Sequence, residues 1–432
     1  MSGIHDDLLA RHRRVLPRWL ALNYEHPIAL VDGEGRRVRD AEGREYLDFL
    51  GGILTTLSGH RVPPVVEAIR RQAERILHTS TLYLIPQQIE LAERIAALVP
   101  IPDARVFFTT SGTEANDTAL LLATTYRRSN QVLAMRNSYH GRSFAAVSVT
   151  GNRFWGTTNL APFHVTYLHG AYQLRSPFRG LPPADYIAAC SADLERVLDT
   201  DVPGDPACLI AEPIQGVGGN AHPPDGLYGE FREILSRRGA LFISDEVQTG
   251  WGRTGEHFWG FEAHGFVPDI ITFAKGLGNG LSLGGVVARA EIMDSLKANS
   301  ISTFGGNPLA TAAALANLEY LLAEDLQGNA RRVGQRLRDG LETLAGRHPG
   351  IAEVRGKGLM LGAELVKPGG LEPDPATTAR VLEHAREGGL LLGRSGLYAN
   401  TLRVAPPLSV TAEEAEEGLA ILAMALERAT AG

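Results

Sequence analysis

The sequence predicts an α/β fold, in which a large central domain holds a mainly parallel, doubly wound sheet and a small α+β domain is built from both ends of the chain. Two observations favour this fold. From about residue 104, short apolar runs alternate with helical patterns, and such alternation is typical of a parallel sheet covered by helices. Turn-rich short strands come before residue 63 and helical patterns dominate after residue 308, so both ends are assigned to the smaller domain.

The N-terminal part is predicted to begin with a helix over residues 8–20, which mix apolar and basic positions. We expect Pro17 to interrupt it and Trp19 to lie on its inner side. The following elements are two strands separated by turn signals and two amphipathic helices with proline in or near the first turn: strands 29–31 and 46–50, helices 63–77 and 86–98.

The central part is predicted from buried apolar runs bounded by glycine, proline and polar residues. Its predicted elements are strands 106–109, 131–135, 208–211, 240–244 and 270–274, and helices 114–128 and 228–238. Residues 171–185 are rich in proline and arginine and predict a long surface loop, to which no function is assigned. The C-terminal part predicts helices 309–323, 329–344, 377–387 and 412–428, with strands 358–365 and 402–405. The domains are placed at 1–62 and 321–432 for the small one and 63–320 for the large one.

The composition describes an ordinary soluble protein of 432 residues with 44% hydrophobic residues. Its 42 basic and 49 acidic residues give a net charge of −7, which argues against a nucleic-acid partner. Cys190 and Cys208 have neither disulfide nor metal-ligand spacing, and the N-terminus does not resemble a signal peptide. No apolar run is long enough to span a membrane. We therefore expect a cytoplasmic protein.

Lys275 stands at the end of the predicted 270–274 strand and before a loop with Gly276, Gly278 and Gly280. A buried amine at such a place loses hydration, which lowers its pKa and frees its lone pair for attack on a carbonyl. From this stretch alone, a surface lysine before a flexible loop is an equally good interpretation. The other polar segments decide between the two.

Ser111, Gly112 and Thr113 follow the 106–109 strand and open a helix. Backbone N–H groups and hydroxyls at a helix N-terminus can bind a phosphate, although an ordinary serine cap would leave the same pattern. After the next strand, Tyr139 could stack on an aromatic ligand and Arg142 could hold a carboxylate with its guanidinium fork.

Asp245 comes directly off the 240–244 strand, where a carboxylate can pair with a buried cation such as a protonated ring nitrogen. A metal site at Asp245 and Glu246 is the rival interpretation, but no histidine pair or further carboxylate cluster accompanies them, so no metal is predicted. Ligands collect at the carboxyl ends of strands in a doubly wound sheet. A phosphate site, an acid for a pyridinium nitrogen and a lysine for a Schiff base together predict a pyridoxal 5′-phosphate pocket. A dinucleotide site is disfavoured, because no Gly-x-Gly-x-x-Gly motif follows the first central strand.

The chain also resembles the class III aminotransferases of fold type I over nearly its whole length. The matching segments are SGTEAND (111–117), YHGR (139–142), EPIQG (212–216), DEVQTGWGRTG (245–255), PDIITFAKGLGNG (268–280), STFGGNP (302–308), RGKGLMLG (355–362) and LRVAPPL (402–408). The resemblance implies a fold type I architecture, a pyridoxal 5′-phosphate cofactor and amino transfer. It also implies a homodimer, or a dimer of dimers, with shared active sites.

Residue by residue, the resemblance implies that Lys275 forms the Schiff base with the cofactor and that Asp245 binds its ring nitrogen. Gln248 would bind the phenolic oxygen, Tyr139 would stack on the ring, and Glu212 would support the pocket. Ser111, Gly112 and Thr113 would hold the phosphate, helped by Thr303 of the neighbouring subunit, and Arg403 would take the α-carboxylate of the substrate. We also predict His140 among the cofactor contacts, and Arg142, Trp19 and Tyr83 among the substrate contacts.

Within the family, three features look most like alanine–glyoxylate aminotransferase 2: the segment 256–261, Val217 after the 212–216 motif, and the segment 393–396. Arg142 is similar instead to the ornithine, acetylornithine and 4-aminobutyrate branch, where an arginine there binds a distal carboxylate. In much of that branch a glutamate at the position of Val217 masks the counterpart of Arg403. The valine here indicates that this gate is missing.

The sequence therefore predicts an aminotransferase that moves an amino group from an amino acid, ω-amino acid or amine to a 2-oxo acid in two half-reactions. Pyruvate or glyoxylate ranks ahead of 2-oxoglutarate as the acceptor. The alternatives that use the same cofactor are a racemase or epimerase and an amine phosphate lyase. A cofactor-free scaffold is a remote third interpretation, disfavoured by the intact lysine and acid.

Overall fold

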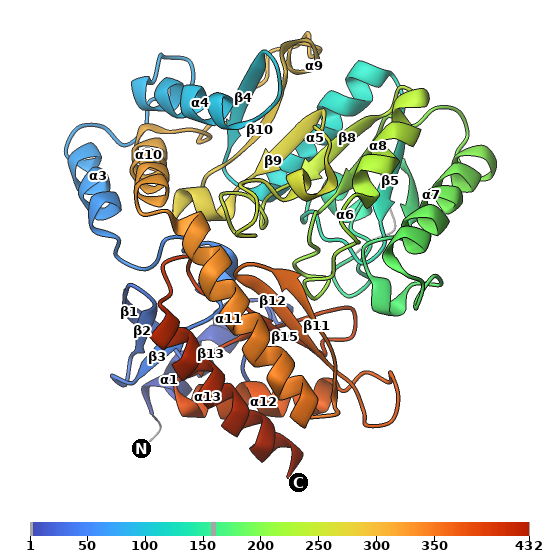
Figure 1. Cartoon of the computed structure of the whole chain (residues 1–432). Coiled ribbons are helices and arrows are strands. Elements are labelled where there is room, and N and C mark those ends of the chain that lie inside the picture. Colours follow the sequence, from blue (N-terminus) through green and yellow to red (C-terminus); the bar gives the residue numbers. More distant parts are fainter. Residues whose placement is uncertain (1–2, 157–160, 432) are drawn as a thin grey trace.

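A seven-stranded sheet forms the centre of the molecule in the computed structural model, which describes residues 3–156 and 161–431 (Figure 1). Its strand order is β4-β10-β9-β8-β7-β5-β6. The strands are β4 (Ala104–Thr109), β5 (Gln131–Met135), β6 (His164–Leu168), β7 (Cys208–Ala211), β8 (Leu241–Asp245), β9 (Ile270–Phe273) and β10 (Gly284–Arg289). All neighbours pair in parallel except β10, which is antiparallel to β4 and β9. The mainly parallel α/β architecture predicted from the sequence is confirmed.

The central strands are buried on both faces, which explains why they are nearly continuous apolar runs. In β7, Cys208 and Ile210 face one hydrophobic cluster, to which α5 (Gly112–Arg127) contributes. Leu209 and Ala211 face the opposite cluster, with α7 (Pro183–Thr200) and α8 (Leu227–Arg237). The alternation of side chains along a strand thus builds two separate layers, one on each face.

Strand β10 has no counterpart in the sequence-based prediction, because it begins with two glycines that weaken any strand pattern. Both glycines are needed by packing. A Cβ at Gly285 would overlap the ring of Phe273, and one at Gly284 would lie 2.8 Å from the Ser111 carbonyl oxygen. This close approach brings β10 against the start of α5.

Two four-stranded sheets lie beside the central sheet, toward the bottom of Figure 1. One consists of β1 (Leu30–Glu34), β2 (Arg37–Asp40), β3 (Glu45–Asp48) and β13 (Leu390–Leu391). It joins the first fifty residues to the C-terminal part through parallel pairing of β3 with β13. The other consists of β11 (Ile351–Lys357), β12 (Met360–Leu365), β15 (Thr401–Val404) and β14 (Gly393–Ser395). The C-terminal helices are α10 (Pro308–Ala323), α11 (Leu326–Arg347), α12 (Pro375–Gly388) and α13 (Ala412–Thr430).

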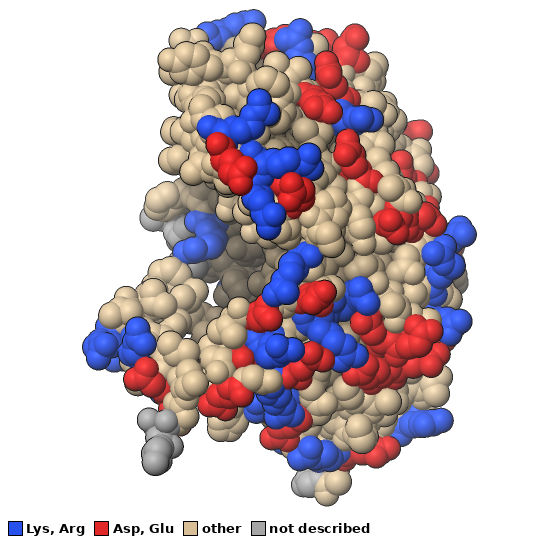
Figure 2. Space-filling model, turned by 90° about the vertical axis from the view of Figure 1, so that its left-hand side faces the viewer, with Lys and Arg blue, Asp and Glu red and all other residues tan. Residues whose placement is uncertain are grey.

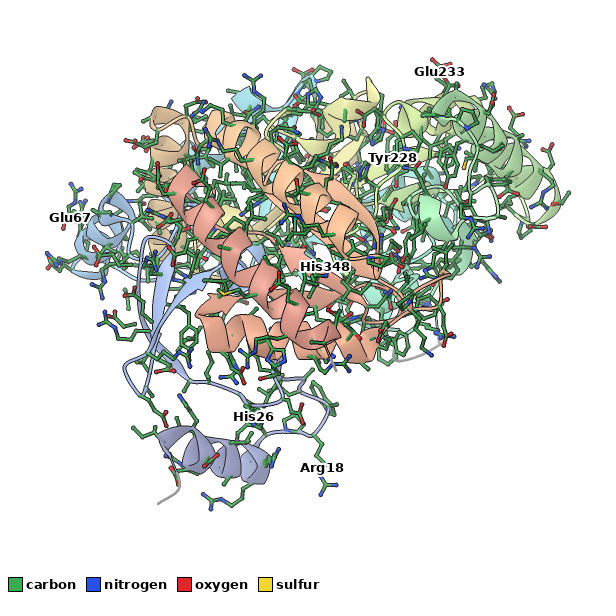
Figure 3. The ribbon with its side chains drawn as sticks, turned by 60° about the horizontal axis from the view of Figure 1, so that its bottom comes forward. Arg18, His26, Glu67, Tyr228, Glu233 and His348 are labelled. Carbon is green, nitrogen blue, oxygen red and sulfur yellow. The ribbon has the colours of Figure 1, made fainter. Side chains whose placement is uncertain are left out.

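The N-terminal segment differs from the prediction. Helix α1 spans Ile4–Val15, buries none of its residues, and ends before Pro17. Trp19 lies beyond the helix with 69% of its surface exposed, so the expected helix over 8–20 with an inward Trp19 is wrong. Figure 3 shows α1 at the edge of the molecule, with Arg18 pointing away from it.

Short helices α2 (Gly51–Leu54), α6 (Phe144–Ser148) and α9 (Ala290–Met293) and the longer α3 (Pro63–Ala73) and α4 (Pro86–Leu98) complete the helices. Residues Gln173–Arg175, Gly260–His264 and Lys275–Gly278 form 3₁₀ turns. The predicted 171–185 loop is shorter than expected, because α7 begins at Pro183. None of the described helices has the length and apolarity required to cross a bilayer. On the face drawn in Figure 2, basic and acidic side chains are interspersed and the surface is hollowed between its upper and lower parts.

Candidate active site

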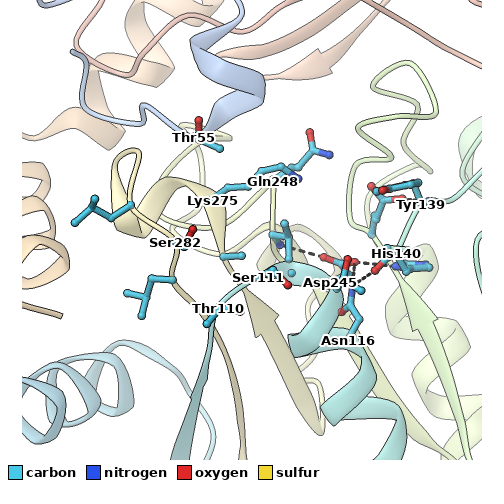
Figure 4. A pocket seen from close by; sticks show the side chains of 18 of the residues that line it. Thr55, Thr110, Ser111, Asn116, Tyr139, His140, Asp245, Gln248, Lys275 and Ser282 are labelled. Carbon is cyan, nitrogen blue, oxygen red and sulfur yellow. Dashed lines mark hydrogen bonds and ion pairs between the residues drawn. The ribbon is translucent and has the colours of Figure 1, made fainter. Parts of the chain in front are cut away.

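A cavity of about 320 Å³ lies at the carboxyl ends of β4, β8 and β9 (Figure 4). Segments far apart in the sequence line it: Thr55, Thr110, Ser111, Gly112, Thr113, Asn116, Tyr139, His140, Gly141, Glu212, Asp245, Val247, Gln248, Ala274, Lys275, Gly280, Leu281, Ser282 and Leu283. Nine of the predicted site residues are therefore in one cavity wall, namely Ser111, Gly112, Thr113, Tyr139, His140, Glu212, Asp245, Gln248 and Lys275.

Helix α5 begins at this cavity. Ser111 is its N-cap, with Oγ accepting a hydrogen bond of 3.2 Å from the amide of Glu114. The amides of Gly112 and Thr113 lie in the first turn, where a helix has no internal acceptor for them. Ser111 is thus an ordinary cap, and the same turn offers free N–H groups and the positive end of a helix dipole to an anion.

Lys275 opens a 3₁₀ turn with a left-handed backbone, at φ +43°. A residue with a side chain is strained there, and such strain persists where surrounding contacts hold it. Asn317 of α10 provides them, since its Nδ2 donates to the carbonyls of Gly276 and Leu277 at 3.1 and 3.0 Å. Burial lowers the pKa of Lys275 from 10.5 to about 8, so about a tenth of the amine is neutral at pH 7, far more than for an ordinary lysine.

Asp245, the last residue of β8, is buried with 4% of its surface exposed. Its Oδ2 accepts from Asn116 Nδ2 at 2.8 Å and lies 2.7 Å from His140 Nδ1, while Oδ1 accepts from the Val247 amide at 3.1 Å. The Asn116 and Val247 donors and the His140 ring hold the carboxylate in one orientation, in which it can pair with a cation in the cavity.

Asn116 was not assigned a role from the sequence, although it lies in the quoted 111–117 segment. Its Nδ2 also donates to the His140 carbonyl, and its Oδ1 accepts from Thr272 Oγ1 at 2.7 Å. The available signal was a polar residue at helical spacing from Ala119 and Leu120, on the apolar side of α5. The contact itself joins residues 129 positions apart, which no local pattern can show.

Glu212 lies at the end of β7 and orients two loops. Its Oε1 accepts from the amide of Tyr139 at 2.8 Å, and its Oε2 accepts from that of Gly216 at 3.0 Å. Burial raises the pKa of Glu212 above its usual value. The rings of Tyr139 and Trp155 pack in a T-shaped arrangement, with 5.5 Å between ring centroids and 74° between planes.

Arg403 lies on β15 and is buried, with 4% of its surface exposed. One guanidinium nitrogen donates to Gln248 Oε1 at 2.7 Å, while Nε has no partner among the described residues. Burial lowers the pKa of Arg403 to about 10. A buried guanidinium with one neutral partner favours an anionic ligand.

The remaining predicted residues are exposed and are not part of the cavity wall. Arg142 is exposed, with its guanidinium over the ring of Trp19 at 5.1 Å from the centroid. Tyr83 has 71% of its surface exposed, and the Thr303 side chain also lies at the surface. A single chain does not bring these four residues into the cavity.

The cavity fits pyridoxal 5′-phosphate. The first turn of α5 can hold the phosphate, Asp245 is arranged to hold a protonated ring nitrogen, and Lys275 is an amine of lowered pKa in the same wall. When bound, this cofactor supplies an aldehyde for the amino group and a ring that takes up electrons from the substrate's Cα. Within residues 3–156 and 161–431, no cluster of His, Cys, Asp and Glu has the composition of a metal site.

Comparisons with known proteins agree with this chemistry. The family model "Aminotransferase class-III" matches residues 20–426. The chain is 39% identical over 414 residues to alanine–glyoxylate aminotransferase 2 homolog 2, mitochondrial, of Arabidopsis thaliana, covering 95% of this chain and 85% of that protein. Its structure matches an (S)-enantioselective omega-transaminase from Thermomicrobium roseum with a TM-score of 0.91, 34% identity and full coverage of both chains.

A second structural match carries the cofactor. It is an amine transaminase from an uncultivated Pseudomonas species in its pyridoxal phosphate-bound form, with a TM-score of 0.88, 32% identity, and 96% and 98% of the two chains covered. These similarities do not favour the racemase, epimerase or phosphate lyase alternatives. The chain belongs to the class-III aminotransferase family, and it is a pyridoxal phosphate-dependent aminotransferase that moves an amino group from a small-molecule donor to a 2-oxo acid.

Proposed function

We propose that the enzyme uses a short 2-oxo acid with a single carboxylate, pyruvate or glyoxylate, as its amino acceptor. The observation that carries this proposal is the stacking of Arg142 on Trp19, at 5.1 Å from the ring centroid. A second carboxylate, as in 2-oxoglutarate, would need a free guanidinium beyond Arg403, and Trp19 covers one face of the candidate. The Arabidopsis relative, whose name specifies alanine and glyoxylate, adds support.

Within this proposal, Lys275 is the covalent attachment point and moves the proton at the substrate's Cα. Asp245 keeps the ring nitrogen protonated, with support from its three hydrogen-bond donors. The first turn of α5 and the Ser111 hydroxyl hold the phosphate, helped by Thr303 of a second subunit. His140 anchors Asp245, while Tyr139, set against Glu212, contacts the ring.

Arg403 takes the α-carboxylate, since it is a buried cation whose one hydrogen bond among the described residues goes to a neutral amide. Arg403→Ala is therefore expected to lose pyruvate turnover, and Arg403→Lys to recover only part of it, because an ammonium cannot form the two-pronged contact. Normal pyruvate kinetics in Arg403→Ala would remove this residue from the site.

2-Oxoglutarate is the second candidate, favoured by the exposure of Arg142 next to the cavity residues 139–141. The test compares kcat/KM for pyruvate, glyoxylate and 2-oxoglutarate in wild type, Arg142→Ala and Trp19→Ala. We expect wild type to prefer the short acids and Trp19→Ala to gain 2-oxoglutarate activity. A strong wild-type preference for 2-oxoglutarate that disappears in Arg142→Ala would reverse the ranking.

We propose a homodimer, or a dimer of dimers, as the active form. Exposed apolar side chains gather in two segments: Leu82 (76%), Tyr83 (71%), Leu84 (88%), Ile301 (54%) and Phe304 (60%). The segments touch, since His78 and Phe304 have ring centroids 5.0 Å apart and Gln88 Nε2 donates to the Gly306 carbonyl. Such a patch on a globular protein indicates a partner, and the family resemblance makes that partner a second copy, with Thr303 helping to hold the phosphate of its neighbour.

Sedimentation at assay concentration tests the assembly. We expect no active monomer, and Leu84→Glu is expected to weaken association and activity together, because it puts a charge into the apolar patch. The matched control is Leu181→Glu, which changes an exposed leucine (44%) outside the two segments. A monomer with full activity would contradict the proposal.

A cytoplasmic location is also proposed. Cys190 and Cys208 are both free and buried, and burial raises the pKa of each thiol. Protonated, inaccessible thiols suit a protein that does not depend on disulfides. Fractionation of the native host with an antibody to the enzyme would test the location, and enrichment in a membrane or secreted fraction would contradict it.

A further inference from the structure

Gln248 and Arg403 form a buried pair that reaches across 155 residues of sequence. Gln248 Oε1 accepts the 2.7 Å hydrogen bond from Arg403, and the two residues have 8% and 4% of their surface exposed. This amide is the one hydrogen-bond partner that the described residues give the guanidinium. Gln248 also lines the cofactor cavity, so one side chain faces both the cavity and the arginine.

The position of Gln248 depends on Gly216. A Cβ at residue 216 would overlap the Oε1, Cδ and Nε2 atoms of Gln248, so any other residue there would displace the amide. The Gly216 amide is itself held by Glu212 at 3.0 Å. Val217 follows, and its side chain offers no acceptor, while its carbonyl accepts from Gly396 at 2.9 Å. The loop therefore admits a neutral amide as the partner of Arg403 and provides no carboxylate from position 217.

The charge of the group that binds Arg403 decides how easily a ligand carboxylate can replace it. The Arg403–Gln248 bond has one charged group, whereas an α-carboxylate brings a second charge and can accept two parallel N–H bonds from the guanidinium, so an incoming α-carboxylate can displace the amide. When the ligand has no carboxylate, the amide still prevents the buried guanidinium from losing its last partner. The pair thus matches a site that must accept ligands with and without an α-carboxylate.

We propose that Gln248 is a specificity-determining positioning residue, whose amide holds Arg403 when the ligand lacks an α-carboxylate and releases it when an α-carboxylate binds. This inference rests on the proposed role of Arg403. It assigns Gln248 a function toward the substrate in addition to its contact with the cofactor, and it assigns Gly216 the function of making room for the amide.

The test is calorimetric binding of propanoate, a carboxylate with no amino or oxo group, to the cofactor-loaded enzyme. If Gln248 competes with the ligand for Arg403, Gln248→Leu should bind propanoate more tightly and Gln248→Glu more weakly, each on the order of tenfold. Changes of propanoate affinity in opposite directions support the proposal. A role limited to cofactor binding or to structure would instead lower the propanoate affinity of both variants. An equal loss of propanoate affinity in both Gln248 variants, or an unchanged affinity in both, overturns the proposal. Cofactor content is measured by absorbance for each variant.

Gly216→Ala provides an independent test of the same competition, because it leaves Gln248 itself unchanged. The added methyl group should displace the amide, and propanoate should bind more tightly, as in Gln248→Leu. Gly218→Ala, in the same loop, is the control, since the three nearest atoms to its Cβ would be Asn137 Nδ2 (2.6 Å), the Asn137 carbonyl oxygen (2.7 Å) and Gln215 Cβ (2.8 Å) rather than atoms of Gln248. Tighter binding in both glycine variants, or in neither, counts against the inference.

Arg403→Ala separates this inference from the proposed function. If Arg403→Ala loses propanoate affinity while the Gln248 and Gly216 variants bind propanoate as wild type does, the inference about Gln248 is overturned and the proposed role of Arg403 stands. Unchanged affinity in Arg403→Ala means that the carboxylate binds elsewhere and overturns both. As a kinetic readout, Gln248→Glu should raise kcat/KM for 1-phenylethylamine relative to that for alanine, because its carboxylate masks Arg403; an unchanged ratio contradicts the inference.

Discussion

The His140 ring pairs with Asp245 inside the protein, with Nδ1 2.7 Å from Oδ2 and both side chains buried. An N–H donated from this ring would occupy Oδ2 and leave Oδ1 of the carboxylate to its other contacts. The pairing also fixes the orientation of Asp245, because Asn116 donates to the same oxygen from another direction. These two contacts orient Asp245 as its proposed role toward a protonated ring nitrogen requires.

Asp245→Asn should reduce the rate of the first half-reaction by on the order of 10²-fold or more, because the amide no longer favours the protonated ring. Stopped-flow absorbance with alanine as donor measures the rate. Asn116→Ala removes one of three donors and should have a smaller effect in the same direction. Normal kinetics in Asp245→Asn would exclude this role.

Lys275→Ala should abolish turnover, since no other amine of the cavity wall can form the covalent linkage and move the proton. Borohydride treatment should then leave no cofactor attached to the chain, as seen by mass spectrometry. The exposed Lys297 provides the control, and Lys297→Ala should retain full activity. Wild-type turnover in Lys275→Ala would be incompatible with the assigned chemistry.

The lowered pKa of Lys275 predicts a pH dependence of cofactor uptake. Since burial lowers this pKa from 10.5 to about 8, covalent uptake of pyridoxal phosphate by the apoenzyme should accelerate as pH rises through about 8 and then level off. The unfolded chain binds one more proton than the folded apoenzyme between these two values, so apoenzyme stability should also rise with pH there. Stopped-flow uptake rates across this range check the first expectation. A midpoint near the ordinary lysine value would show that the amine is not perturbed.

Glu364 is the centre of a buried ion network that fastens the 171–182 loop to β12. It binds Arg355 at 2.6 Å and Arg175 at 2.7 Å and accepts a hydrogen bond from Tyr172. Burial alone would raise the pKa of Glu364, but Arg355, Tyr172 and Arg175 hold it below its usual value. Its stabilising effect is therefore present above the unfolded pKa and is lost as pH falls through the lowered one.

Glu364→Leu should lower the free energy of unfolding by about 3–5 kcal/mol, because it leaves Arg355 buried without its main partner. Urea denaturation followed by fluorescence measures the change. Glu353 is the matched control, since it contacts the same Arg355 at 2.6 Å with 30% of its side chain exposed, and its removal should cost less than about 1 kcal/mol. Equal effects of the two substitutions would contradict the argument.

The local sequence pattern was sufficient to predict the strands of the central sheet that consist of an uninterrupted apolar run. Strands β5 and β7 match the predicted ranges, because a strand covered on both faces needs an uninterrupted apolar run. Lys275 and Asp245 could be singled out because parallel strands bring their carboxyl ends to one edge, so polar residues there converge. The division at residues 62 and 320 and the roles of the site residues stay predictions.

Only the tertiary structure decided the contacts between distant segments. The left-handed backbone of Lys275 is held by Asn317, Asp245 is held by Asn116, and Arg403 reaches Gln248. Each partner comes from another element, and no periodicity in the sequence records which side chains meet across a fold. Trp19 was misplaced for a related reason, since an apolar residue near a helical pattern is expected to be buried. The sequence by itself thus determined the chemistry available to the cavity, and the packing determined which groups are paired and which remain free for a ligand.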